Sequence, residues 1–362
     1  MTAGPGDPNP GVALPGELEA ALRRLVRAEL RAEVVRTELL AGGLGRRRFL
    51  RLHTDGTPAT LVARIDAEED PARRPTGLPP EPDLEPLRSF LEGRGIPVPR
   101  SYGRDAAHGI HLIEDAGPTS LRDAVAARPD ERLALYEEAC DLVPRFQESR
   151  DPGDGLPAFS RRLDAAFFAY KADFFARWSL PLALRREARD AERAVVHEAF
   201  AAIAAELRGA PHRLAHRDYQ SANLHVRKGA PRGKRLVVLD VQGALLAPPE
   251  YDLVCLLRDS YVELPEDEVA HHVARTRLRL PDAPAETELA RRFDLLTLTR
   301  KGKDHALFVY TAETRGDRSY LAYLPATVRY LRAAAARAAA RDPALARLAE
   351  LVSQLPESRC AP

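Results

Sequence analysis

The sequence is poor in cysteine and has no long apolar run. Its three cysteines, Cys140, Cys255 and Cys360, are too few and too far apart for a zinc quartet or a disulfide framework. No apolar stretch approaches the ~18–20 residues that span a bilayer. The N-terminus lacks the basic and apolar regions of a secretion signal. We therefore expect a protein of the reducing cytoplasm that has no membrane partner.

The sequence also lacks an excess of positive or negative charge. Lys+Arg 54 against Asp+Glu 53 leaves a net charge of +1, so no overall field draws the chain onto a nucleic acid or an acidic membrane. A hydrophobic fraction of 45% with a mean hydropathy of −0.33 is typical of a globular protein. Lysine is scarce, and the first lysine of the chain is Lys171.

The distribution of residue types along the chain predicts two lobes, preceded by a disordered Pro/Gly-rich tail at 1–15. Residues 16–117 form the predicted N-lobe, which is rich in strands, and residues 118–362 form a larger helical C-lobe. In the N-lobe the hydrophobic spacing predicts a helix over 16–37, strands at 38–40, 48–52, 60–65 and 109–114, and a helix over 84–94. This arrangement is an α+β fold.

One interruption breaks the helical C-lobe, at residues 214–247. It contains His216 and Asp218 as a His-x-Asp pair, with Asn223 five residues after the aspartate, and Asp240 closes a later apolar strand. Two strands, at 224–227 and 236–241, flank a glycine turn in this segment. Such a hairpin would bring Asn223 and Asp240 side by side.

These residue types suit phosphoryl transfer from ATP. A carboxylate must position the attacking hydroxyl and accept its proton, and hard oxygen ligands must hold Mg²⁺ on the phosphates. Asp218 fits the first role, and Asn223 with Asp240 fits the second. The plain alternative is that the first two are turn residues and Asp240 caps a strand.

The chain resembles the aminoglycoside phosphotransferase and choline-kinase-like superfamily, which has the bilobal protein-kinase architecture, from about Val35 to Leu331. Within it, the chain is most similar to the branch of bacterial anomeric sugar kinases that act on N-acetylmuramate and N-acetylglucosamine. The segments that carry this likeness are Arg47–Arg51, Gly95–Pro99, Leu112–Asp115, His216–Tyr219, Tyr251–Asp259 and Tyr320–Pro325.

The resemblance implies a role for further residues. Glu114 and the residues after it would form the hinge whose backbone meets adenine. Asp252 would support the catalytic loop, to which His216 belongs. A glycine turn would cover the ATP phosphates with backbone N–H groups, and its glycines are Gly42, Gly43 and Gly45.

The chain departs from the family pattern at three places. Kinase folds place a lysine on the third strand, and Arg64 is the only basic residue on the 60–65 strand, so we expect Arg64 to hold the α/β-phosphates with Glu85 as its matching helix acid. The alternative is a solvent-facing strand arginine. Gly243 stands where relatives often keep a second acid, and Gln220 stands where they often have histidine.

The acceptor is expected to be a small hydroxylated molecule, because twelve residues from Asp240 to Asp252 are too few for a peptide-binding activation segment. Mixed charges over 150–200 favour a neutral or anionic sugar over a polycationic aminoglycoside. Asp173 and Arg258 are the predicted substrate contacts. Lys301-Gly302-Lys303 lacks the glycine and strand of a Walker motif. We thus expect an ATP- and Mg²⁺-dependent kinase for a sugar or amino sugar, and the alternatives are an aminoglycoside or choline-type kinase and a degenerate nucleotide-binding pseudokinase.

Overall fold

The computed structural model describes residues 14–40, 47–66 and 80–358. The chain divides into two compact units. The sheet unit takes residues up to 74 together with 98–117, and the helical unit takes 75–97 and 118–362. The segment 75–97 thus groups with the helical unit, whereas we expected the N-lobe to run unbroken from 16 to 117. The expected lobe boundaries stay a prediction.

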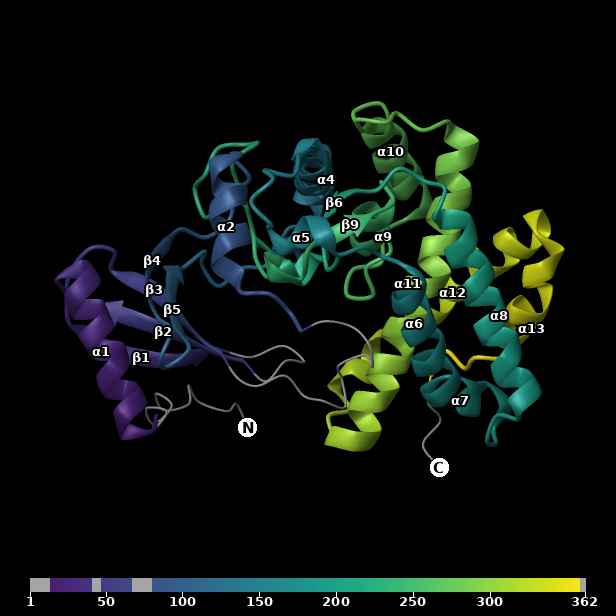
Figure 1. Ribbon diagram of the computed structural model, residues 1–362, viewed down its shortest axis with the longest axis horizontal. Helices are drawn as coiled ribbons and strands as arrows, with labels where there is room; N and C mark the ends of the chain where they lie inside the picture. Colours follow the sequence, from purple (N-terminus) through teal and green to yellow (C-terminus); the bar gives the residue numbers. More distant parts are fainter. Residues whose placement is uncertain (1–13, 41–46, 67–79, 359–362) are drawn as a thin grey trace. The chain divides into compact units, whose positions relative to one another are not determined.

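The sheet unit is built on five antiparallel strands in the order β1-β2-β3-β5-β4 (Figure 1). They are β1 Val34–Leu40, β2 Arg48–Thr54, β3 Thr60–Ile65, β4 Ser101–Asp105 and β5 Ile110–Glu114. Four of them overlap expected strands, although only the last three residues of β1 were expected to be strand. We missed β4, because Ser-Tyr-Gly-Arg-Asp has no apolar alternation.

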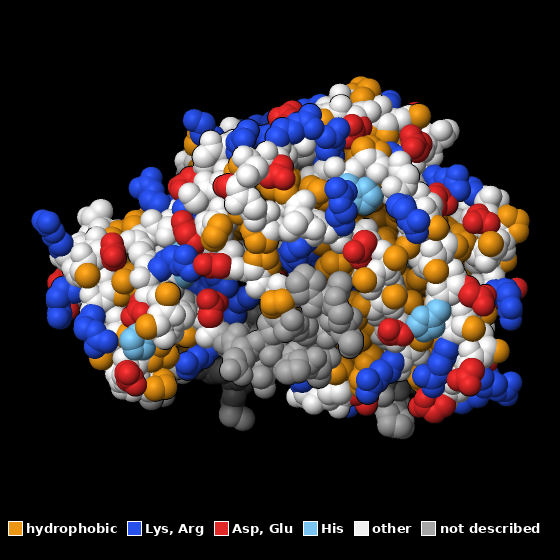
Figure 2. Space-filling view, in the orientation of Figure 1, with side chains coloured by type: hydrophobic (Ala, Val, Ile, Leu, Met, Phe, Trp, Pro, Cys, Tyr) orange, Lys and Arg blue, Asp and Glu red, His pale blue; other side chains and the backbone are white. Residues whose placement is uncertain are grey.

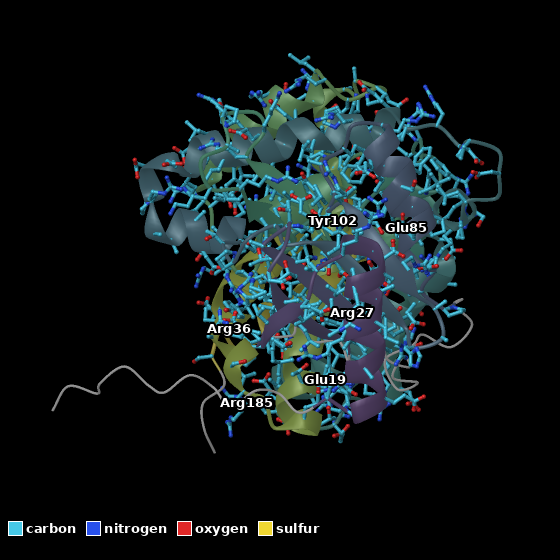
Figure 3. All side chains as sticks on the ribbon, turned by 90° about the vertical axis from the view of Figure 1, so that its left-hand side faces the viewer. Glu19, Arg27, Arg36, Glu85, Tyr102 and Arg185 are labelled. Carbon is cyan, nitrogen blue, oxygen red and sulfur yellow. The ribbon has the colours of Figure 1, made fainter. Side chains whose placement is uncertain are left out.

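Helix α1 (Gly16–Leu30) supplies the apolar layer of this unit. Its buried residues Leu22 and Val26 pack with strand residues such as Leu50, Leu61 and Leu112. Polar residues of α1 pair locally: Glu19 binds Arg23 at 3.0 Å and Arg27 binds Glu33 at 2.5 Å (Figure 3).

The expected extent of this first helix was wrong. The helix ends at Leu30, because Arg31 adopts a left-handed conformation with φ of 53°. Val34 then pairs with Thr54 as the start of β1. Valine and threonine at 34–37 are compatible with either the helical or the strand hydrophobic period, and the pairing with β2 decides in favour of a strand.

The helical unit holds α2 (Leu84–Gly93) and the helices after residue 118. These are α3 Leu121–Ala127, α4 Arg132–Glu148, α5 Pro157–Ser160, α6 Ala165–Trp178, α7 Leu180–Leu184, α8 Asp190–Leu207, α9 Tyr251–Leu257, α10 Glu266–Arg277, α11 Glu286–Arg315, α12 Leu324–Arg341 and α13 Ala346–Ser353. Short 3₁₀ turns are Pro129–Glu131, Ser221–Asn223, Val241–Gly243, Ser319–Tyr323 and Pro343–Leu345. Acidic and basic side chains are interspersed on the face of this unit that Figure 2 shows.

Helix α11 packs against other helices of this unit, among them α6, α9 and α12. At Gly302 a Cβ atom would lie 3.2 Å from a ring carbon of Phe175 on α6, so the two helices approach closely there. The expected hairpin is present as β7 (Leu224–Val226) and β8 (Leu236–Val238). A second pair, β6 (Arg213–Ala215) with β9 (Leu245–Ala247), escaped prediction because each strand has three residues.

No helix within the described ranges is long and apolar enough to cross a membrane.

Lys171 on α6 is a buried amine, 5% exposed, whose Nζ donates to Tyr251 Oη at 3.4 Å and lies over the Phe168 ring. Burial, then the charge of Arg300, lowers its pKa to about 7. An unfolded lysine has a pKa of about 10.4, so folding costs free energy wherever the unfolded chain holds this proton. That cost is fully present below pH 7 and disappears above the unfolded pKa.

We therefore expect Lys171→Met to raise the melting temperature at pH 6.5 and to lose most of that gain at pH 10. Thermal unfolding of both proteins at both pH values measures it. Lys234→Met, at an exposed turn position, is the control. A shift of the same size at both pH values would show that packing, and not the charge, makes the difference.

Candidate active site

A buried carboxylate fixes the backbone of the loop at residues 216–223. Asp252 of α9 is 2% exposed and accepts hydrogen bonds from the backbone N–H of His216 at 2.7 Å and of Arg217 at 3.1 Å. Arg217 takes a left-handed conformation with φ of 77°, which is costly for a side chain with a Cβ. The two bonds to Asp252 offset that cost and set the direction in which the next residue, Asp218, leaves the loop.

The ring of His216 has a defined tautomer. Its Nδ1 accepts from the backbone N–H of Asp218 at 3.2 Å, so Nε2 carries the proton and donates to the carbonyl of Leu239 at 2.7 Å. The ring is fully buried between Phe146 and Tyr219. His216 thus ties the loop to the segment that carries Asp240.

The far end of the loop is held in the same way by a second acid. Asp259 is 1% exposed and accepts from both the backbone N–H (2.8 Å) and the hydroxyl (2.5 Å) of Ser221. Asn223 follows, and its side-chain amide donates to the Asp218 carbonyl at 2.9 Å. Its amide oxygen is then available to a ligand.

The β7–β8 hairpin brings Asn223 near Asp240, as the spacing predicts. The backbone N–H of Leu239 donates to the Asn223 carbonyl at 2.8 Å, so Asp240 lies one residue beyond the paired position. Asp240 has φ of 59°, a left-handed conformation that is uncommon outside glycine. Its Oδ1 accepts from the Gln242 amide at 2.5 Å.

Negative charge gathers around Asp240. Protein atoms crowded around its carboxyl, then the charges of Glu81 and Asp218, raise its pKa, although the side chain is still accessible to solvent. Glu81 lies close by: its Oε2 is 3.4 Å from the Gln242 amide, and its Oε1 would be 3.3 Å from a Cβ at Gly243. Glu81 therefore brings an acid to the side of Gly243, where relatives often keep one.

Asp218 is paired with a cation that the sequence did not indicate. Arg300 of α11 donates from Nη2 to Asp218 Oδ1 at 2.6 Å and from Nη1 to the Arg217 carbonyl at 3.2 Å. Removal from water alone would raise the pKa of Asp218, but the charges of Arg300 and Lys303 outweigh it and hold the pKa below its ordinary value. Asp218 is therefore a carboxylate at neutral pH.

The segment 300–304 is the part of the site that motif reasoning missed. Arg300 and Asp304 are both 6% exposed, and Arg300 Nε lies 3.2 Å from Asp304 Oδ2. The only signal in the sequence was an unusual density of charge, Arg-Lys-Gly-Lys-Asp, on a helix that is otherwise mostly buried. Contact with Asp218 spans 82 residues of chain, so no local pattern could reveal it.

The predicted nucleotide residues fall in different places. Arg64 is 5% exposed, on the face of β3 opposite the α1 core, and pairs with Asp66 at 2.7 Å. The solvent-facing alternative for Arg64 is thereby wrong. Glu85, at the start of α2, binds Arg88 at 2.7 Å. Glu114 ends β5, and its Oε2 accepts from the Arg100 backbone N–H at 3.1 Å. The glycines at 42, 43 and 45 lie outside the described residues.

The two predicted substrate contacts are not brought to Asp218 by any contact of the described residues. Asp173 is on the exposed side of α6 and faces His197 at 3.3 Å. Arg258 is 4% exposed, binds both oxygens of Glu266 at 2.5 and 2.8 Å, and lies over the Tyr330 ring. These contacts direct both terminal nitrogens of its guanidinium to Glu266, so they give no support to its predicted substrate role.

The donor set suits a hard divalent cation that arrives with a nucleotide. Within 14–40, 47–66 and 80–358, no three His, Cys, Asp or Glu side chains form a metal cage of their own. Mg²⁺ needs less from the protein when phosphates and water supply the other ligands. Asp240 and the amide oxygen of Asn223 provide two oxygens. Desolvation by surrounding protein atoms, then the negative charges of Glu81 and Asp218, raises the pKa of Asp240, and a cation would relieve the repulsion between these charges.

We expect Asp252→Asn to lower the free energy of unfolding by about 1–3 kcal/mol, because the new amide NH₂ would face a buried backbone N–H that now lacks an acceptor. Urea unfolding measures the change, with Asp130→Asn on the exposed turn before α4 as the matched control. Equal stability of the two variants would contradict the support role of Asp252.

Comparison with known proteins agrees with this geometry. Residues 36–290 match the model of the phosphotransferase enzyme family. The chain is 30% identical to the N-acetylmuramate/N-acetylglucosamine kinase of Pseudomonas aeruginosa over 94% of this chain and 95% of that protein. It is 29% identical to the kinase of the same name from Neisseria meningitidis, over 71% of this chain and 76% of that protein.

Solved structures agree on the fold. The choline kinase LicA from Streptococcus pneumoniae superposes with a TM-score of 0.59 at 15% identity, covering 90% of this chain and 100% of LicA. The gentamicin complex of APH(2")-IIa gives a TM-score of 0.60 at 15% identity, covering 88% and 96%. The expected protein-kinase-like α+β fold is thus confirmed. The chain belongs to the phosphotransferase enzyme family and is a kinase that transfers phosphate to a hydroxyl group.

Proposed function

We propose that the chain is an ATP- and Mg²⁺-dependent sugar kinase of the cytoplasm, which phosphorylates a hydroxyl of an N-acetylmuramate- or N-acetylglucosamine-type amino sugar in cell-wall sugar recycling. The observation that carries the proposal is 30% identity to a kinase of that name over 94% of the chain. An Asp218 carboxylate held in a rigid loop is the chemical support for it.

Asp218 is the proposed catalytic base. Arg300 occupies its Oδ1 at 2.6 Å, and in the described part of the chain no hydrogen bond reaches Oδ2. The acceptor hydroxyl would bind Oδ2 and pass its proton there as its oxygen forms a bond to the γ-phosphorus, while the bond from that phosphorus to the β–γ bridging oxygen breaks and ADP leaves. Arg300 keeps the base ionised and fixes its orientation, so that one oxygen points to the substrate.

Asn223 and Asp240 are the proposed ligands of Mg²⁺, which supplies neutralisation of the phosphate charge when bound. Gln242 steadies the Asp240 carboxylate through its amide. His216 and Asp252 support both groups, since one links the loop to Leu239 and the other fixes the loop backbone.

Arg64 on β3 of the sheet unit remains the proposed phosphate-binding cation. The other proposed nucleotide contacts are Glu114 of β5, the glycines at 42, 43 and 45, and Glu85 of α2 in the helical unit. Arg64 is buried on β3 and pairs with Asp66, whose side chain is 48% exposed. A phosphate could take the place of that partner.

The test is an ATP-consumption assay with the purified chain on a panel of acceptors: N-acetylmuramate, N-acetylglucosamine, glucose, kanamycin and choline, with and without EDTA. Phosphorus NMR of the product identifies the hydroxyl. Turnover restricted to the two N-acetyl sugars and abolished by EDTA supports the proposal. Turnover of kanamycin or choline in their place would reject it.

We expect Asp218→Asn to lower kcat by about 10²–10⁴-fold with little change in ATP binding, because the variant keeps the shape and loses the proton acceptor. Steady-state kinetics and isothermal titration with ATP measure the two quantities. Turnover near the wild-type rate would remove Asp218 from the role of base.

We expect Arg64→Ala to raise KM for ATP about tenfold and to lower kcat, since one charge-assisted hydrogen bond to a phosphate is lost. Arg64→Lys should restore much of the loss, and Arg36→Ala, an exposed arginine of β1, serves as control. If Arg64→Ala changes the melting temperature alone, Arg64 is a structural residue and the phosphate contact lies elsewhere.

A further inference from the structure

The cations on α11 around Asp218 are not equivalent. Arg300 binds Asp218 and Asp304, and it is buried. Lys301 is 2% exposed, donates to Ser260 Oγ at 3.1 Å and pairs with Asp304 Oδ2 at 2.7 Å. Both are therefore used within the fold.

Lys303 differs from both. Its side chain is 26% exposed, and its nearest acid contact is Asp304 Oδ1 at 3.8 Å, which is longer than the 2.7–2.9 Å of a charge-assisted hydrogen bond. Within 14–40, 47–66 and 80–358 it donates no hydrogen bond. The ammonium group keeps its donors for another acceptor.

Lys303 lies close to Asp218, the proposed base, which an acceptor hydroxyl must approach. It lies three residues after Arg300, on the same face of α11 and one turn along from the side chain that holds Asp218 at 2.6 Å. The strongest charges around Lys303 are those of Asp304, Arg300, Asp218 and Arg217. Around Asp240 they are those of Glu81, Asp218 and His216. Asp218 is common to both, so Lys303 and Asp240 both lie within electrostatic range of the base.

The charge of Lys303 persists at neutral pH. Burial, offset in part by Asp304, lowers its pKa to about 8, so most molecules carry an ammonium at pH 7. A partly desolvated ammonium without a direct acid partner is a good receptor for an oxyanion.

We propose that Lys303 recognises a carboxylate substituent of the acceptor sugar, which makes it the residue that selects an acidic amino sugar over a neutral one. This inference rests on the proposed sugar-kinase function. An oxyanion near Asp218 has two sources, the sugar substituent and the transferred phosphate of ATP, and the kinetics below separate them.

The experiment compares wild type, Lys303→Met, Lys303→Arg and the exposed control Lys234→Met. Each is assayed for kcat and KM with N-acetylmuramate, which carries a carboxylate, with N-acetylglucosamine, which does not, and with ATP. Removal of the Lys303 charge also alters Asp218, but that effect is common to the two sugars. The ratio of kcat/KM for the acid sugar over the neutral sugar isolates the carboxylate contact.

We expect Lys303→Met to lower this ratio roughly tenfold or more, as the loss of one hydrogen bond to a charged group does, mainly through KM for the acid sugar. Lys303→Arg should restore part of it, and Lys234→Met should leave it unchanged. Titration calorimetry of both sugars with the first two proteins gives the same comparison without turnover.

An unchanged ratio in Lys303→Met overturns the assignment, and a rise in KM for ATP alone assigns the charge to the phosphate. If the wild-type protein neither binds nor phosphorylates either sugar, the proposed function itself is rejected, and the Lys303 assignment with it. Turnover of both sugars with an unaltered ratio rejects the Lys303 assignment alone.

Discussion

The site depends on one interaction, the pair of hydrogen bonds from the backbone of His216 and Arg217 to the buried carboxylate of Asp252. These bonds hold Arg217 in a left-handed conformation, and that turn of the backbone directs Asp218 outward and the Arg217 carbonyl toward α11. Arg300 and the Cys255 thiol both donate to that carbonyl. The base, its cation and the loop that carries them are therefore fixed by a residue that touches no substrate.

The placement of the cations depends in turn on helix packing. Gly302 lies where a Cβ would come within 3.2 Å of Phe175, which is a tight contact, and 3.5 Å of Phe200, which is an ordinary van der Waals distance. The helix α11 therefore packs closely on α6 at this glycine. Arg300, Lys301 and Lys303 flank that glycine. The Lys301-Gly302-Lys303 segment, which lacks the features of a Walker motif, is thus a position of close helix packing between charged residues.

The sequence revealed the parts of the site that lie close together in the chain. The spacing of Asp218, Asn223 and Asp240 follows from one loop and one hairpin, which is why it could be interpreted without a structure. Arg300 contacts the base from a helix 82 residues later, and Glu81, which lies before α2, brings its negative charge near Asp240; such interactions leave no periodicity to detect. The first helix was extended too far for a related reason, since only the partner strand shows that Val34 is in a sheet.

Arginine carries nearly all the positive charge of this chain, which makes the lysine at 303 informative. A guanidinium there would present a planar fork to Asp304, whose Oδ2 already accepts from Arg300 and Lys301, so the guanidinium would bind Oδ1 through one N–H. Part of its charge would then be used within α11. An ammonium is a compact point charge that rests 3.8 Å from Oδ1 and stays available to an incoming anion. A lysine in place of an arginine at 303 therefore leaves one positive charge near the base without a direct acid partner among the described residues. Its neighbours Arg300 and Lys301 are both engaged in contacts within the fold.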